Sequence, residues 1–381
     1  MALFAYGIFK VIYAPHKAFK EIAQNPRYIG PILIMILFIA ANVAAAYAFL
    51  AKAYVEVTVP SSENKDLWTE NKTFWEPLNG ANCAENFTDY IAGNYYGNKS
   101  IEFSVESDKI AMELNNIGSV NCSSQGGYTR LYLRVKWTSP SYPPENATLC
   151  IYSGTSSSCR DITNKLSASG VWNNLTVQLA DGGWVGEIDW GNVTGLKLEM
   201  MWNKTSNIRV LLDGLFFGGV YKSSLEGATT YLALYGANSF MQFTLRWFLL
   251  GAALYIFTKL FKAKTVWRAA LVLAGFALVT MFVQAVINAA TFSAMPALRY
   301  PLEYVGGVKG EAESAYNKIM EEAWLLNRVY SAVQMAMIVW TVMLCGIAVR
   351  LSTEFTWTTS FLTAFVAYFA ALFIESFLMQ I

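Results

Sequence analysis

The stretch Ile29-Gly-Pro-Ile-Leu-Ile-Met-Ile-Leu-Phe-Ile-Ala-Ala-Asn-Val-Ala-Ala-Ala-Tyr-Ala-Phe-Leu-Ala51 contains no charged residue. It exceeds the roughly 20 residues that cross the hydrocarbon core of a bilayer and the apolar part of a removable signal peptide, so it predicts a retained membrane helix. Four further apolar runs bring the expected number of transmembrane helices to five: 241–258, 269–291, 329–349 and 357–379. A composition of 55% apolar and 14% charged residues agrees with a chain that lies partly in lipid.

Basic residues predict which side of the membrane each loop faces, because cytoplasmic loops retain Lys and Arg. They gather before the first apolar run, between the second and third, and between the fourth and fifth: Lys10, Lys17, Lys20, Arg27, Lys259, Lys262, Lys264, Arg268 and Arg350. This predicts a plasma-membrane protein with cytoplasmic residues 1–28, extracellular residues 52–240 and an extracellular C-terminal Ile381. The net charge of +1 gives no reason to expect a nucleic-acid partner.

The polar stretch between the first two apolar runs carries every Asn-x-Ser/Thr acceptor site of the chain. Its composition predicts about three such sites by chance. There are eight: Asn71, Asn86, Asn98, Asn121, Asn146, Asn174, Asn192 and Asn203. We therefore expect covalent N-glycans on this stretch, which requires that it be exported.

Four cysteines lie in the same stretch, Cys83, Cys122, Cys150 and Cys159, and an oxidising compartment favours disulfides between them. Three pairings are open to four cysteines. We favour Cys150 with Cys159, because the eight residues between them have the composition of a hairpin turn, and this leaves Cys83 with Cys122. Cys345 stands alone in the fourth apolar run.

Residues 52–222 alternate apolar and polar side chains with the period of a β-strand. The pattern recurs at 101–105, 131–137, 175–179, 196–200 and 208–212, with Gly, Asn, Ser and Pro between. The expected fold is thus an α-helical membrane domain with an all-β extracellular jelly-roll sandwich of about eight strands, inserted between the first and second helices. Residues 223–240 suggest a connector on the membrane surface, and 241–381 hold the four remaining helices.

Four segments of the β region, 171–177, 183–184, 189–196 and 208–218, resemble the second half of galactose-binding-like jelly rolls and carbohydrate-binding modules. The resemblance implies that exposed indole rings bind sugars, and the alternative for several of them is the sandwich core. The candidates are Trp137, Trp172, Trp184, Trp190 and Trp202. Asp213 resembles an aspartate that binds a structural calcium in such modules, although one carboxylate cannot supply the six or more oxygens that calcium needs. We expect no other cofactor.

The run Gly186-Glu-Ile-Asp-Trp190 is similar to the catalytic strand of laminarinase-type glycosidases, and alternation would place its two acids on one face. Retaining hydrolysis needs a second carboxylate about 5 Å away, and Gly191 and Asn192 stand where that motif has Glu. The single histidine, His16, precedes the first apolar run. These observations favour a protein that is not an enzyme.

The stretch Ala14-Pro-His-Lys-Ala-Phe-Lys-Glu-Ile-Ala23, followed by Asn25-Pro26 and Gly30-Pro31, resembles the start of the Yip (Ypt-interacting protein) family. The resemblance extends over 10–51 and 241–381 and implies a scaffold that shapes membranes or recruits partners. Yip relatives usually keep a short loop where this chain has the β region. A cell-surface role therefore suits the insertion better than vesicle traffic.

Arg246 and Glu375 lie at comparable depths in the second and fifth apolar runs. Charges within hydrocarbon are costly, so we expect a pair that clamps two helices, the alternatives being separate contacts with the membrane surface or a transport site. Gln284 and Asn288 are expected to hydrogen-bond between helices. Together the sequence predicts a non-enzymatic surface protein that binds glycan or protein. The alternatives are an accessory subunit of a membrane complex and a transporter.

Overall fold

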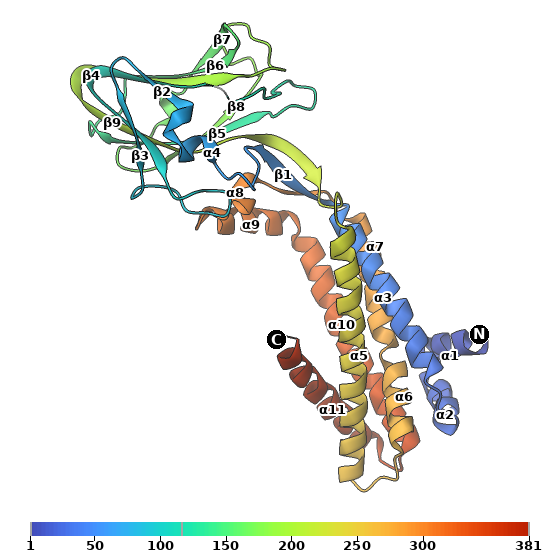
Figure 1. The fold of residues 1–381 in the computed structure, drawn as a ribbon. Coiled ribbons are helices and arrows are strands. Elements are labelled where there is room, and N and C mark those ends of the chain that lie inside the picture. Colours follow the sequence, from blue (N-terminus) through green and yellow to red (C-terminus); the bar gives the residue numbers. More distant parts are fainter. Residues whose placement is uncertain (1, 116, 380–381) are drawn as a thin grey trace. The chain divides into compact units, whose positions relative to one another are not determined.

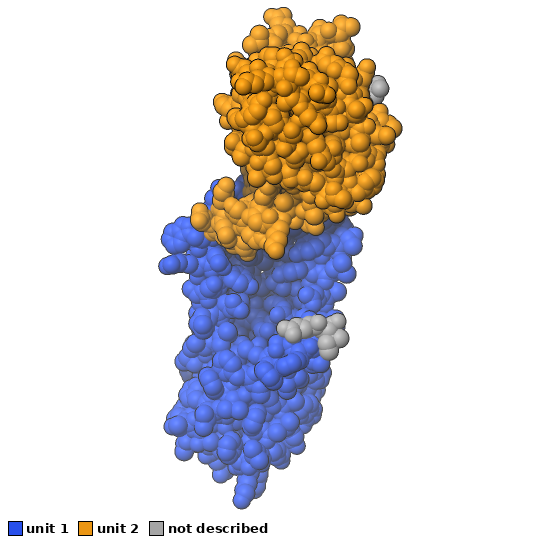
Figure 2. Space-filling model, turned by 90° about the vertical axis from the view of Figure 1, so that its left-hand side faces the viewer, with its two compact units in different colours: residues 1–53, 223–298, 322–381 blue, residues 54–222, 299–321 orange. Residues whose placement is uncertain are grey.

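The computed structural model describes residues 2–115 and 117–379. Two compact units divide the chain (Figure 2): unit 1 contains 1–53, 223–298 and 322–381, and unit 2 contains 54–222 and 299–321. The chain therefore passes between the units four times, after residues 53, 222, 298 and 321. The predicted extracellular C-terminus at Ile381 lies outside the described residues.

Unit 1 is helical (Figure 1). Its helices are α1 (Ala2–Tyr13), α2 (Pro15–Gln24), α3 (Ile29–Leu50), α5 (Thr229–Leu260), α6 (Trp267–Ala277), α7 (Val279–Ala294), α10 (Trp324–Ser352) and α11 (Trp357–Leu378). By length and composition, five helical stretches of the described chain can cross a membrane, with α6 and α7 counted as one. The predicted number of apolar helices is thus confirmed.

One segment of unit 1 differs from its predicted role, and a second contributes to the core of the unit. The helix α5 begins at Thr229, so residues 229–240 are its first turns and not a separate connector. Phe19 of α2 is fully buried and belongs to the core of the unit, together with Phe38 of α3 and Phe243 of α5. The helix α2, within the segment 1–28, therefore packs part of its apolar face against other helices.

The motif Gly30-Pro31 lies where three helices approach one another closely. A Cβ atom on Gly275 of α6 would lie 2.5 Å from Pro31 of α3 and 2.6 Å from the indole nitrogen of Trp247 of α5. The same indole nitrogen donates a hydrogen bond to the Leu271 carbonyl at 2.7 Å. Glycine at position 275 is therefore required by the distance between the helices.

Unit 2 consists of β-strands with short helices (Figure 1). The strands are β1 (Ala53–Val59), β2 (Trp75–Leu78), β3 (Asn82–Asn86), β4 (Ser100–Leu114), β5 (Arg130–Ser139), β6 (Asn146–Ser153), β7 (Ser156–Asp161), β8 (Asn173–Gln178), β9 (Gly195–Ser223) and β10 (Leu298–Tyr300). The helices are α4 (Leu67–Glu70), α8 (Leu302–Val305) and α9 (Glu311–Glu322), with single 3-10 turns at Lys72–Phe74 and Thr163–Lys165.

The long strand β9 connects the whole sheet. It pairs antiparallel with β4 along most of its length, and also with β6 near its start and with β5 beyond Ile208. The two strands predicted at 196–200 and 208–212 are one continuous strand. Leu196, Leu198 and Met200 are fully buried on its core face, as period-2 alternation requires. The expected antiparallel β fold is confirmed.

Residues 299–321, between α7 and α10 in sequence, are part of unit 2. The Arg134 guanidinium on β5 donates two hydrogen bonds to the Glu311 carboxylate of α9, at 2.7 and 2.6 Å. The backbone N–H of Leu302 donates to Glu56 of β1 at 2.7 Å, and the same carboxylate accepts from the Tyr132 hydroxyl at 2.7 Å. Tyr132, Leu302, Tyr96 and Phe216 form a small apolar cluster around these contacts.

We expect Glu311→Ala to lower the free energy of unfolding of unit 2 by about 3 kcal/mol, because it leaves the buried Arg134 guanidinium without its bidentate partner. Glu321→Ala, an exposed acid of the same helix, is the matched control. Denaturant unfolding of the full chain in detergent, followed by tryptophan fluorescence, measures both. Equal midpoints for the two variants would contradict the assigned role of the pair.

Candidate functional site

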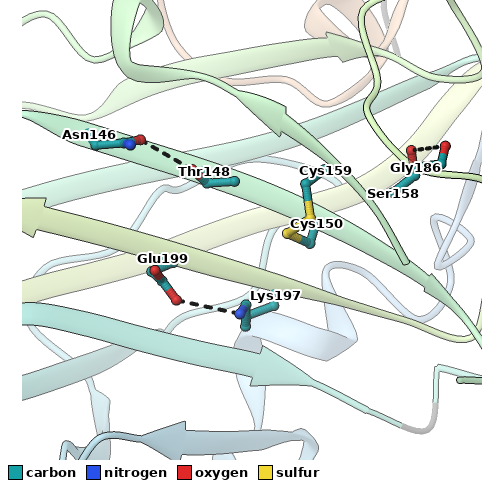
Figure 3. Close-up of a disulfide and its surroundings, with 8 residues drawn as sticks. All are labelled: Asn146, Thr148, Cys150, Ser158, Cys159, Gly186, Lys197 and Glu199. Carbon is teal, nitrogen blue, oxygen red and sulfur yellow. Dashed lines mark hydrogen bonds and ion pairs between the residues drawn. A yellow bond between two sulfur atoms is a disulfide. The ribbon is translucent and has the colours of Figure 1, made fainter. Parts of the chain in front are cut away.

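A disulfide joins Cys150 of β6 to Cys159 of β7, which confirms the favoured pairing (Figure 3). The two residues are directly opposite in the antiparallel register. The neighbours of Cys150 in the strand, Leu149 and Ile151, are fully buried, so alternation turns the disulfide to the face away from the core. The short spacing predicted the hairpin, and the alternation of its strands places the disulfide on the outer face.

The second predicted disulfide, between Cys83 and Cys122, is wrong, since both thiols are free. Cys83 lies on β3 opposite Phe103 of β4, whereas Cys122 is held near Trp190, whose carbonyl accepts its backbone N–H at 2.6 Å. Cys83 is thus a strand residue, whereas Cys122 lies in the segment between β4 and β5, outside the strands. Burial raises the pKa of Cys83 to about 11 and that of Cys122 to about 12, so neither is a reactive thiolate at neutral pH.

The disulfide-bonded hairpin positions a loop that begins after β8. Backbone hydrogen bonds of 2.8 Å connect Cys159 and Val185 in both directions, and the Ser158 hydroxyl donates to the Gly186 carbonyl at 3.0 Å (Figure 3). These contacts attach the loop to β7 at the residue that carries the disulfide. The loop is consequently ordered by its surroundings although it contains three glycines between residues 182 and 186.

Trp184 and Trp190 meet on this loop. Their ring centroids are 5.3 Å apart and their planes make an angle of 70°, an edge-to-face pair. Both rings pack partly against the core of unit 2 and keep part of their surface exposed. The Trp184 indole N–H donates to the Gln178 carbonyl at 2.9 Å, which fixes the direction of its ring. We name this surface the indole corner.

Polar groups surround the indole corner. The Arg160 guanidinium lies 6.0 Å from the centroid of the Trp184 ring and is paired with Asp181 at 2.7 Å. Asp189 is exposed, and its carboxylate accepts the backbone N–H of Gly191 at 2.9 Å. Glu187 is also exposed, but residues 186–190 do not form a strand, so the prediction that Glu187 and Asp189 share one sheet face is wrong.

The other predicted indoles have different positions. Trp137 and Trp202 are in the core, with 0% and 2% exposure, so they are wrong as sugar platforms. Trp172 is partly exposed, and the Lys136 ammonium, itself paired with Asp89, lies 5.8 Å from its ring centroid. Alternation alone did not reveal which of the five rings faces solvent.

The eight glycan acceptor asparagines occupy positions compatible with attachment. Six are exposed: Asn98, Asn121, Asn146, Asn174, Asn192 and Asn203. Asn71 and Asn86 are partly exposed. Modification of these residues stays a prediction. Asn192 lies two residues after Trp190 and accepts a hydrogen bond from the Ser119 hydroxyl at 2.6 Å, so a glycan there would begin beside the indole corner.

Asp213 lies fully buried beside a second buried carboxylate, Asp66. Asp213 accepts backbone N–H groups of Ile91 and Gly214 at 2.6 and 2.7 Å, and Asp66 accepts that of Gly97 at 2.8 Å. Burial, followed by the neighbouring Asp66, raises the pKa of Asp213 well above its usual value. The folded chain therefore holds a proton on Asp213 more tightly than the unfolded chain does.

The fit of a calcium ion to this pair is incomplete. Two carboxylates supply at most four oxygens, and three backbone N–H groups already use part of that capacity. Among the described residues no group of three or more His, Cys, Asp or Glu is arranged to hold a metal ion. The calcium suggested by the resemblance stays a prediction.

In unit 1 the structure brings together the predicted pair of Arg246 and Glu375. Two guanidinium N–H groups of Arg246 donate to the Glu375 carboxylate at 2.7 and 2.8 Å. Gln284 and Asn288 instead form no hydrogen bond within the described part of the chain, so the prediction that they bond between helices is wrong. Sequence analysis missed the contribution of Arg160 and Asp181 to the indole corner, because the two lie 21 positions apart.

The solved structures that resemble this chain match about two fifths of its length. No protein-family model and no curated protein matches the sequence. A solved family 11 carbohydrate-binding module from Clostridium thermocellum, in complex with a β-1,3-1,4-mixed-linked tetrasaccharide, is similar with 12% identity, a TM-score of 0.28, and coverage of 42% of this chain and 94% of that chain. A family 30 carbohydrate-binding module gives 11% identity, a TM-score of 0.28, and coverage of 39% and 77%.

An exo-β-agarase gives 11% identity and a TM-score of 0.31, with 40% of this chain covered. This chain spans only 24% of the length of that agarase. Likeness at these identities and scores assigns no ligand and no activity to the chain.

We expect the stability of the wild-type protein to fall as pH rises from the ordinary aspartate pKa through the raised pKa of folded Asp213, because Asp213 binds a proton more tightly in the folded than in the unfolded chain. The folded state therefore holds more protons at pH values above the ordinary aspartate pKa, and folding weakens as pH rises through this window. Asp213→Asn should flatten the slope, and Asp189→Asn, on an exposed carboxylate, should leave it unchanged.

Thermal unfolding of the full chain at each pH measures this effect, and an unaltered slope in Asp213→Asn would refute it. The same assay with CaCl2 at pH 8 tests whether a calcium ion binds at Asp66 and Asp213. A rise in the melting temperature of the wild type that Asp213→Asn lacks would favour an ion in place of the proton on Asp213.

Proposed function

We propose that this chain is a multi-pass plasma-membrane protein whose extracellular β domain, unit 2, binds glycans at the indole corner without catalysis. The observation that carries the proposal is the pair Trp184 and Trp190, partly exposed and fixed in direction. Two rings at a steep angle form a corner that can contact the apolar C–H faces of a pyranose from two sides. Hydroxyl groups of the sugar would find Arg160, Asp181 and Asp189 as partners.

The charged side chains at the indole corner favour binding of an uncharged glycan. Arg160 is neutralised by its ion pair with Asp181, and the remaining charged groups of the loop, Glu187 and Asp189, are exposed carboxylates. An acidic sugar would be repelled by these two groups, since like charges at short range disfavour binding. The proposed ligand class is therefore a neutral oligosaccharide.

Sidedness is supported by three independent features of the chain. The eight acceptor sites all lie between residues 71 and 205, a disulfide stabilises the same region, and apolar helices precede and follow it. Disulfides persist in oxidising compartments, and N-glycans are added to exported segments. A scaffold role of the helices, as implied by the Yip-family resemblance, is compatible with this placement.

Binding of a protein is the second candidate function, either as a receptor or as an accessory subunit of a larger complex. The observation that favours it is Val185, which is 80% exposed at the indole corner itself. An aliphatic side chain beside two indoles is typical of a protein contact. Purification in mild detergent distinguishes the two functions, because a subunit would elute with a stoichiometric partner.

We expect the full-length protein to bind neutral oligosaccharides on a glycan array and Trp184→Ala to weaken this binding by about tenfold, the loss expected for one stacked ring. Arg160→Gln should reduce binding as well while leaving the indoles in place. Trp172→Ala removes a partly exposed indole elsewhere and is the matched control. Absence of binding to every neutral glycan, or equal losses in the Trp184 and Trp172 variants, would refute the proposed site.

The acceptor site at Asn192 provides a further test of where the proposed glycan-binding site lies. Asn192→Gln removes any glycan beginning beside Trp190, so neutral oligosaccharides should bind it at least as well as the wild type. A loss of binding in this variant would mean that the attached glycan is part of the site, which would contradict a free indole corner.

We expect a glycosidase that removes N-glycans to increase the electrophoretic mobility of the protein expressed in a glycosylating host, with Asn98→Gln and Asn146→Gln each removing one glycan. Ala263→Asn creates an acceptor site with Thr265 in the predicted cytoplasmic loop between α5 and α6, and it should stay unmodified. Glycan on this variant together with none at Asn98 or Asn146 would invert the assigned topology.

A further inference from the structure

A cavity of about 400 Å³ lies within unit 1. Helices α3, α5, α7, α10 and α11 all contribute to its wall. Its lining is more polar than the helices as a whole, since it includes five amide side chains and one guanidinium: Asn42, Gln242, Gln284, Asn288, Gln334 and Arg246. Its volume falls within the range of roughly 300 to 1,000 Å³ that is common for small-ligand sites.

Four of these amides have no partner in the protein. Gln242, Gln284, Asn288 and Gln334 form no hydrogen bond within residues 2–115 and 117–379, whereas Asn42 donates to the Ser239 hydroxyl at 2.7 Å. The wall also contains a closed pair of hydroxyls, Thr280 and Thr341, at 2.6 Å. An amide that serves only to join helices would be expected to form a contact of that kind.

Unpartnered amides are costly in helices whose composition suits a bilayer, because hydrocarbon offers no hydrogen bonds. Here they come from α5, α7 and α10 and line the same space. Gln284 and Asn288 are four residues apart on α7 and so share one face of that helix. The arrangement supplies convergent donors and acceptors for a group that is not part of the chain.

The charges of the cavity select among ligands. Arg246 is paired with Glu375 through two hydrogen bonds, and the other lining residues are uncharged. A charged ligand would therefore enter without an opposite charge to balance it, at a large desolvation cost. Rings are also available to cover C–H surfaces, among them Tyr235 and the stacked pair Phe292 and Tyr330, with centroids 6.4 Å apart.

We propose that this cavity binds an uncharged polyhydroxyl group, either the sugar headgroup of a membrane lipid or a free sugar. Amide groups both donate to and accept from hydroxyls, so four unpartnered amides match such a group and do not select for a net charge. The site is separate from the indole corner and does not depend on glycan binding by unit 2. It adds a second ligand site, in the helical unit.

The experiment uses the full chain in nanodiscs of phosphatidylcholine that contain monoglucosyl diacylglycerol as the minor lipid, with native mass spectrometry to count retained lipid. Parallel samples contain phosphatidylglycerol in its place, or free glucose in the buffer. The variant Gln284→Leu/Asn288→Leu removes two amides, and Thr291→Val removes a polar group of the same helix outside the cavity.

We expect the wild type and Thr291→Val to retain one glucosyl lipid or glucose, the double variant to lose at least about tenfold in affinity, and phosphatidylglycerol not to be retained. Retention of the lipid identifies a headgroup site, and retention of glucose alone identifies a site for free sugar. Without either ligand, the melting temperature of the double variant should equal or exceed that of the wild type, because the removed amides have no structural partners.

Three results would overturn the proposal. They are equal retention by the wild type and the double variant, preferential retention of phosphatidylglycerol, and retention of neither sugar ligand. A lower melting temperature of the double variant in the absence of ligand would show that the two amides stabilise the helices instead.

Discussion

The paired carboxylate contacts of Glu56 and Glu311 determine how this chain is organised. Glu311 holds the guanidinium of Arg134, and Glu56 accepts from the Leu302 backbone and the Tyr132 hydroxyl. Through them a segment that lies between two long apolar helices in sequence becomes part of the β unit. Unit 2 is consequently built from two separate stretches, 54–222 and 299–321, and it is complete only when both are present. Binding studies therefore require the full chain.

The features that sequence analysis predicted well are those that depend on local or averaged properties. An apolar helix is recognisable because about 20 consecutive residues must be predominantly apolar to cross a bilayer, and one polar residue changes the mean hydropathy of such a run little. The disulfide of Cys150 and Cys159 is recognisable because its cysteines are nine positions apart in one hairpin. The pairing of Arg246 with Glu375 could also be predicted, because the two residues lie at comparable depths in their apolar runs and each has few other polar partners at that depth.

The features that sequence analysis missed depend on contacts between segments that are distant in the sequence. Nothing near Cys83 or Cys122 in sequence shows that the first lies on a strand and the second outside the strands, with both thiols free. Alternation includes Trp137 in a predicted strand and leaves Trp184 outside the predicted strands, but only the folded structure shows that Trp137 is enclosed in the core and that Trp184 is partly exposed on a loop. The amides Gln284 and Asn288 were assigned to helix pairing because sequence cannot show a space between helices. In each case the deciding information was the position of another element, which periodicity does not contain.

The indole corner, which we propose as the glycan site, shows how a loop becomes ordered by its surroundings. Its two rings owe their direction to the hydrogen bond of Trp184 with Gln178, to packing on the core, and to the attachment of Val185 beside the disulfide. A preordered surface loses less conformational entropy when it binds than a mobile loop would. The same reasoning applies to the cavity of unit 1, whose amides project from helices and not from loops.

The division of unit 2 into two stretches also affects how the chain withstands proteases. Because four covalent connections join the units, after residues 53, 222, 298 and 321, a single cut in any one of them leaves both units attached. Release of the larger stretch would need two cuts and also the rupture of the contacts around Glu56 and Arg134. Proteolytic release of unit 2 from the helical unit is thus opposed by the path of the chain itself.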